Sequence, residues 1–149
     1  MKKICLFCRI IKKEIDEEPI WESEKYVAYL DRCPAFTGMT MVMPKEHHPS
    51  DIFQLPPTIT SELFEASRTV AKLMIKKLKV KRVAIVVEGL GVDHTHIKLY
   101  PIHGLKKKFQ ETWSTERVFF KTYPGYLSTQ LGPELTREEL KKLSIKFKS

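Results

Sequence analysis

GVDHTHIKLYP, residues 91–101, is the stretch that decides the fold, because polar and apolar residues alternate in it over the length of a β-strand. Successive side chains of a strand point to opposite faces of its sheet. We therefore expect His94, His96, Lys98 and Tyr100 to share one face, while the opposite face packs on a core. Two imidazoles and an ammonium on one surface indicate a site for a metal ion or for an anion.

Length and composition limit the class of protein. With 149 residues, of which 42% are hydrophobic and 10% aromatic, the chain suits one globular domain with a substantial core. The net charge is +8, and the part after residue 103 is itself rich in lysine and arginine. Excess positive charge favours phosphate-bearing partners, either nucleotides or nucleic acid, although a lysine-rich surface also serves solubility alone.

Cysteine usage indicates the redox compartment. The chain has three cysteines, Cys5, Cys8 and Cys33, and we find neither a signal peptide nor a long apolar run in it. An odd number of cysteines in such a chain predicts a reducing, cytoplasmic setting and no membrane association. Cys33 stands alone beside Pro34, and we expect it to be a small buried hydrophobic residue.

The residue patterns predict a fold that combines helices with an antiparallel sheet. A short helix is expected after the Cys5–Cys8 pair, followed by paired strands at 26–31 and 40–44. Apolar residues three and four apart predict a core-facing helix at 58–77. The β-branched run at 82–87 indicates a buried strand, which a glycine-containing turn joins to the histidine strand as a hairpin.

The character of the chain changes after residue 103. A basic run at Lys106–Lys108 is followed by scattered aromatic residues. Thr136 and Glu139 then form a capping-box pattern, which predicts a final helix through about Ile145. We therefore divide the chain into a domain at 1–103 and a basic, aromatic C-terminal extension at 104–149, and we expect the extension to pack on the same domain.

The chain contains a complete donor set for a tetrahedral metal ion. Cys5 and Cys8 offer two sulfur atoms, and His94 with one of the neighbours His47 and His48 offers two nitrogen atoms. Such a set is typical of structural zinc. The bound ion would hold the N-terminal segment against the sheet and would have no coordination position left for water. A Cys-x-x-Cys pair by itself is equally typical of redox chemistry, and a reduced, metal-free pair is the other alternative.

His96 is the best candidate for a nucleophile or base. A neutral imidazole can attack a phosphorus atom and hold it as a phosphoramidate intermediate. Lys98 is expected on the same face, where its ammonium would neutralise phosphate oxygens during such a transfer. The alternatives are a surface histidine that binds nothing and a solvated lysine.

These motifs resemble the histidine triad (HIT) proteins, which are nucleotidyl hydrolases and transferases. The similarity covers about two thirds of the chain and rests on four motifs: CLFCRII at 5–11, AYLD at 28–31, GMTMVMPKEH at 38–47 and HTHIKLYP at 94–101. The resemblance implies an α+β fold, with a five-stranded antiparallel sheet and one long and one short helix. It also implies a homodimer.

The resemblance further implies a role for individual residues. A structural zinc ion would be held by Cys5, Cys8, His47 and His94, and His96 would be the nucleophile. The nucleoside pocket would be formed by Phe7, Ile10, Tyr29 and Asp31. The Asp31 carboxylate can accept two hydrogen bonds from the ribose hydroxyls, and the alternative is that it only caps a turn.

The sequence also departs from the family at the phosphate end of the site. Lys98 replaces the third histidine of the triad, Met39 replaces a second active-site histidine, Val87 stands where asparagine is common, and the loop at 88–93 is short. We expect a hydrolase or transferase that acts on the α-phosphate of a nucleoside phosphate or phosphoramidate. The alternatives are a weakly active or inactive nucleotide-binding regulatory module, and direct nucleic-acid binding through Lys106–Lys108 and the aromatic residues that follow.

Overall fold

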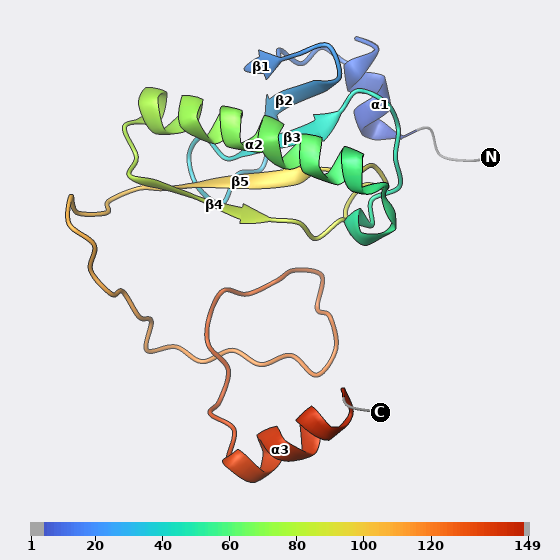
Figure 1. Cartoon of the computed structure of the whole chain (residues 1–149). Coiled ribbons are helices and arrows are strands. Elements are labelled where there is room, and N and C mark those ends of the chain that lie inside the picture. The colour runs from blue at the N-terminus through green and yellow to red at the C-terminus, as the bar shows by residue number, and fades with distance from the viewer. Residues whose placement is uncertain (1–4, 148–149) are drawn as a thin grey trace. The chain divides into compact units, whose positions relative to one another are not determined.

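A computed structural model describes residues 5–147 of the chain (Figure 1). Five strands form one antiparallel sheet in the order β1-β2-β3-β5-β4, which confirms the α+β fold with a five-stranded sheet. None of the helices in this described part is long and apolar enough to cross a membrane. The elements are α1 (Leu6–Ile11), β1 (Trp21–Glu22), β2 (Tyr26–Leu30), β3 (Thr40–Pro44), η1 (Ile52–Gln54), α2 (Pro57–Leu78), β4 (Arg82–Val86), β5 (Ile97–Ile102) and α3 (Arg137–Ile145).

The long helix α2 covers one face of the sheet and forms the main core with it (Figure 1). It begins at Pro57 and ends at Leu78, and the cap residue Lys79 that follows has a left-handed φ of 56°. Its buried residues recur three or four positions apart, as the predicted core-facing helix requires. They are Leu63, Ala66, Ser67, Val70 and Met74. From the sheet, Val42, Ile97 and Leu99 pack in the same cluster and are fully buried.

The short helix α1 packs in a second, smaller cluster. Phe7 and Ile10 of α1 are buried there together with Val27, Tyr29 and Met43 of the sheet. These strand residues alternate with residues that pack under α2, so α1 and α2 contact opposite faces of the sheet. The packing of Phe7 and Ile10 agrees with the short helix predicted from the sequence.

Two burial predictions are wrong. The β-branched run of β4 predicts a buried strand, yet every residue of β4 is exposed or half-buried, and Ile85 is 45% exposed. Strand β4 is the outermost strand of the sheet, next to β5. A β-branched run indicates strand conformation but not a central position in the sheet, which depends on the topology. Cys33 is exposed because it lies in the connection between β2 and β3, where its backbone N–H donates to Asp31 Oδ1 at 2.8 Å.

The histidine strand is shorter than predicted. Strand β5 begins at Ile97, and from there the burial alternates as expected, with Ile97, Leu99 and Pro101 buried. Lys98 and Tyr100 face the opposite side and are half-buried. His94 and His96 precede the strand, so the prediction of one shared strand face holds only from residue 97 onward.

The chain divides into two compact units, of which the first ends at Lys108 and the second begins at Phe109. In the second unit, the Thr136 hydroxyl accepts a hydrogen bond from the backbone N–H of Glu139 at 3.3 Å, and the Glu139 carboxylate accepts one from the backbone N–H of Thr136 at 2.8 Å. This reciprocal pair confirms the predicted capping box at the start of α3. The expectation that the extension packs on the domain stays a prediction.

Candidate functional site

The segment just before β5 is held by the loop that follows β3. The backbone N–H of Thr95 donates to the carbonyl of His48 at 2.9 Å, and the Thr95 hydroxyl donates to the carbonyl of Pro49. The backbone N–H of Ser50 donates to Asp93 at 3.0 Å. These bonds replace the regular ladder with β3, which explains why the strand starts only at Ile97. The hydrogen bonds from Ser50 engage the carboxylate of Asp93 and are the main cause of its lowered pKa.

Four side chains from three segments converge beside this loop. They are Cys5 and Cys8 at the start of the chain, His47 after β3 and His94 before β5, and their donor atoms all lie within 4.8 Å of one another. His94 Nδ1 lies 3.5 Å from Cys5 Sγ and 3.6 Å from Cys8 Sγ, and His47 Nδ1 lies 3.4 Å from Cys8 Sγ. The donors chosen from the sequence are therefore brought together. Of the neighbouring histidines, His47 rather than His48 belongs to this cluster.

The geometry of these four donors fits a metal ion. A tetrahedral zinc ion, with bonds of about 2.3 Å to sulfur and about 2.0 Å to nitrogen, would separate a sulfur and a nitrogen ligand by about 3.5 Å. The separations between Sγ and Nδ1 atoms match this value. The other ring nitrogen of His94, Nε2, lies 2.9 Å from the carbonyl oxygen of Pro44, to which it can donate a proton. Such a hydrogen bond fixes the ring with Nδ1 free as a ligand.

His96 is buried next to this cluster, with only 3% of its surface exposed. Its Nδ1 lies 2.7 Å from the carbonyl oxygen of His94, so Nδ1 carries the proton and Nε2 carries the lone pair. The Phe7 ring packs edge-on against the His96 ring, with 5.1 Å between the ring centres. Burial lowers the pKa of His96, and the positive charge of Lys98 lowers it further. The ring is therefore neutral at neutral pH and has one orientation.

Three further polar groups lie near His96. Lys98 is half-buried on β5, opposite Met41 of β3 and Val86 of β4. The carboxylates of Glu88 and Asp31 act in the opposite direction to Lys98 and raise the pKa of His96. The pKa of Tyr100 is raised mainly by burial, and the same two carboxylates raise it further. Glu88 is not among the residues predicted from the sequence. Its position directly after a strand and before a glycine is the signal that could have indicated it.

The residues predicted to bind the nucleoside lie close together in the fold. Phe7, Ile10 and Tyr29 share one buried cluster, and Asp31 follows the last residue of β2. The Asp31 carboxylate accepts the hydrogen bond from Cys33, so it caps the turn, which is the alternative role considered for it. This bond occupies one lone pair of one oxygen, and a carboxylate has about four such acceptor sites, so room remains for a ligand hydroxyl.

A cavity of about 580 Å³ opens beside Tyr29. Its apolar part includes Ile15, Val27 and Tyr29, and its polar part includes Glu18 and Glu22. Burial raises the pKa of Tyr29, and the neighbouring carboxylates raise it further. The volume lies in the range of small-molecule pockets. Apart from Tyr29, these residues were not predicted from the sequence, because the acidic run at 14–24 resembles an ordinary solvated surface.

Comparisons with known proteins identify the family. The pattern of the HIT domain matches residues 12–104. The chain belongs to the HIT domain family. The match includes the sheet, α2 and both histidines before β5, and it leaves out the Cys5–Cys8 pair and the extension.

Individual relatives of this HIT protein are distant. An uncharacterised HIT-like protein of Methanocaldococcus jannaschii is 34% identical over 105 residues, which are 66% of this chain and 78% of that protein. An adenosine 5'-monophosphoramidase of Saccharomyces cerevisiae is 26% identical over 121 residues, which are 78% of this chain and 73% of the enzyme. The crystal structure of a HIT family protein from Bacillus anthracis superposes with a TM-score of 0.64 at 26% identity, and it covers 99% of this chain and 97% of its own.

Proposed function

We propose that this HIT protein is a nucleotidyl hydrolase or transferase that acts on the α-phosphate of a nucleoside phosphate or phosphoramidate. The proposal rests on the burial of His96 and on the position of its ring proton. Its Nδ1–H is held by the carbonyl of His94, its ring is buried, and its pKa is lowered, so a neutral Nε2 is available as a nucleophile. The yeast relative, which is named as a monophosphoramidase, supports phosphorus–nitrogen bonds as the substrate class.

The reaction would proceed in two displacements. In the first, His96 Nε2 forms a bond to the α-phosphorus while the bond from phosphorus to the leaving amine or oxygen breaks, and the leaving group takes up a proton. In the second, water or another acceptor attacks the phosphorus, gives up its proton, and releases His96. Lys98 would stabilise the negative charge on the phosphate oxygens in both steps. The Nδ1–H bond to His94 would stabilise the positive charge on the ring while the covalent intermediate exists.

The nucleoside would bind on the side of α1. Phe7, Ile10 and Tyr29 would contact the base, and Asp31 would accept hydrogen bonds from the ribose hydroxyls. The cavity beside Tyr29 supports this placement, because it extends the same apolar surface.

The metal site would be structural. With Cys5, Cys8, His47 and His94 as ligands, a zinc ion has no coordination position left for water or substrate. It would instead hold α1 against the sheet and keep the carbonyl of His94 in place for His96. The free cysteines that such a site requires fit a reducing, cytoplasmic setting.

We include a homodimer in the proposal. Strand β4 is at the edge of the sheet, and its half-exposed face, with Ile85 at 45% exposure, offers a surface for a second copy. Edge strands of this kind pair readily with another chain. Sedimentation analysis of the full chain tests this part: a dimer is expected, and a monomer at high concentration would contradict it.

The second candidate function is a nucleotide-binding regulatory module with little turnover. Met39 favours it, because this residue is buried at 4% exposure and offers no proton to a phosphate at a position where the family resemblance implies a histidine. Lys98 also favours it, since an ammonium cannot easily exchange protons with a leaving group at neutral pH. In this alternative the nucleotide binds but no covalent intermediate forms.

Incubation with an adenosine phosphoramidate separates the two functions. Wild type should release AMP and should form an acid-labile adenylyl-protein in a rapid quench. The His96→Ala variant should do neither, while it still binds AMP. His103→Ala is the matched control, because His103 is an exposed histidine that bonds only the carbonyl of Thr37 in the described structure. Binding of AMP without turnover in wild type would favour the regulatory module.

A further inference from the structure

The outer face of α2 and the turn after it form a strongly basic surface. No Asp or Glu occurs at 66–87, and all basic residues of this stretch are exposed. Together these residues carry seven positive charges, whereas the net charge of the whole chain is +8. They are Arg68, Lys72, Lys76, Lys77, Lys79, Lys81 and Arg82.

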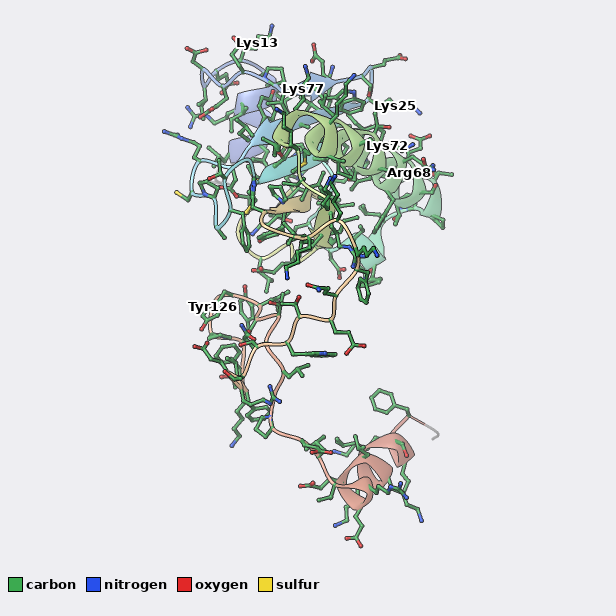
Figure 2. The ribbon with its side chains drawn as sticks, turned by 90° about the vertical axis from the view of Figure 1, so that its left-hand side faces the viewer. Lys13, Lys25, Arg68, Lys72, Lys77 and Tyr126 are labelled. Carbon is green, nitrogen blue, oxygen red and sulfur yellow. The ribbon has the colours of Figure 1, made fainter. Side chains whose placement is uncertain are left out.

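Four of these cations form a ridge. Arg68, Lys72 and Lys76 are spaced by four residues, which places them on one side of α2, and Lys79 is the cap residue that directly follows the helix. This side lies opposite Leu63, Ala66, Val70 and Met74, which face the core. At a rise of about 1.5 Å per residue the helical part of the ridge, from Arg68 to Lys76, is about 12 Å long. Figure 2 labels two residues of the ridge, Arg68 and Lys72, which follow one another along α2.

The ridge is not explained by the stability of the fold. Arg68 pairs with Glu65 at 3.2 Å, whereas the side chains of Lys72, Lys76 and Lys79 have no hydrogen bond or ion pair to any residue of 5–147. Lysines in the last turn complement the helix dipole, but that effect fades within one turn and does not reach Lys72. Like charges four residues apart destabilise a helix. An arrangement that costs stability in the free protein indicates a partner that neutralises it.

The chemistry of the ridge selects the class of partner. Five of the seven cations are lysines, which bind phosphates as point charges rather than carboxylates in bidentate pairs. The stretch at 68–82 contains no aromatic residue on which unpaired bases would stack. The apolar face of α2 is buried on the sheet, and Ile75, at 39% exposure, does not provide the broad apolar face with which helices insert into a lipid surface.

We propose that this ridge is a binding surface for the phosphate backbone of double-stranded nucleic acid, without preference for base sequence. Regularly spaced lysines along a convex helix match regularly spaced phosphates, and binding releases the counterions condensed on them. The ridge shares no residue with the His96 site or with Lys106–Lys108. It does not rest on the catalytic proposal, since it needs neither nucleotide nor metal.

The test compares two variants with the same reduction in charge. The ridge variant carries Lys72→Gln, Lys76→Gln and Lys79→Gln, and the control variant carries Lys106→Gln, Lys107→Gln and Lys108→Gln. Binding of a labelled DNA duplex and a labelled RNA duplex to the full chain is measured by fluorescence anisotropy between about 50 and 200 mM salt. Circular dichroism and AMP binding report whether each variant is folded.

We expect wild type and the control variant to bind both duplexes with the same salt dependence. The ridge variant should bind at least tenfold more weakly, and its slope of log affinity against log salt should be lower by about 2.7, which is about 0.9 for each phosphate that is no longer neutralised. His96→Ala should bind as wild type does. Equal weakening in both variants, or unchanged binding by the ridge variant, would overturn the proposal. So would binding to phosphatidylserine vesicles, or to single strands alone, without binding to duplexes.

Discussion

Substitution of Cys8 by serine should release the metal and destabilise the domain by several kcal/mol. The proposed zinc ion joins Cys8 to His47 across 39 residues and to His94 across 86 residues. The loop-entropy relation for crosslinks gives about 4 kcal/mol for a loop of about 40 residues. Two such closures give an upper bound of about 8 kcal/mol, and crosslinks often deliver less than this relation predicts, typically about 2–4 kcal/mol.

A loss of about 4 kcal/mol should lower the melting temperature by about 15 °C for a domain of this size. The assay combines metal analysis of the purified protein with thermal unfolding followed by circular dichroism. Treatment of wild type with a chelator should reach the same melting temperature as Cys8→Ser. Cys33→Ser is the matched control, because Cys33 is exposed and does not belong to the cluster. It should keep the metal and the wild-type melting temperature.

Two outcomes would refute this reasoning in different ways. If Cys8→Ser retains one metal ion per chain, Cys8 is not a ligand and the proposed set is wrong. If the metal is lost but the melting temperature stays at the value for Cys33→Ser, the ion does not stabilise the fold by joining the three segments. In the second case the ligands lie at the right distances for another reason, such as a thiol–imidazole hydrogen-bond network.

Three further predictions concern single side chains. Lys98→Ala should lower kcat for AMP release by about 100-fold to 1,000-fold, the effect of removing one preorganised donor to a charged phosphate, and an unchanged kcat would contradict its proposed role. Leu63→Ala should lower the free energy of unfolding by about 3 kcal/mol in urea denaturation, because Leu63 is fully buried between α2 and the sheet. Hydrogen bonds from Lys25 and Tyr26 lower the pKa of Glu62 in the folded protein. The stabilisation by Glu62 should therefore be present above the ordinary glutamate pKa and be lost as the pH falls through the lowered value, and Glu62→Gln should remove this part of the acid sensitivity.

The sequence predicts local structure well where a single periodicity decides it. The spacing of Leu63, Ala66, Val70 and Met74 identifies α2 without other information, because one helical face must be buried. The capping box at the start of α3 is equally local. The alternation in β5 is correct from Ile97 onward, where the strand pairs with β3 through Leu99 and with β4 from Lys98.

The predictions fail where distant segments decide the outcome. His94 and His96 follow the alternating pattern, yet bonds from Thr95 and Asp93 to the loop after β3 draw them out of the ladder. The exposure of β4 depends on its place at the edge of the sheet, which its own residues do not encode. The donor set of the metal site could be predicted because the chain contains few cysteines and histidines. The chemistry of the ligands therefore limited the choice before the geometry was known.

His94 takes part in two sites through two different parts of the same residue. Its ring faces the cysteine cluster, while its backbone carbonyl holds the Nδ1–H of His96. A substitution at position 94 would therefore have to keep both a metal ligand and a backbone path. A shift of the backbone at this position would move the metal ligand and the hydrogen-bond partner of His96 together. Loss of the imidazole alone would remove the ligand and leave the carbonyl that orients His96.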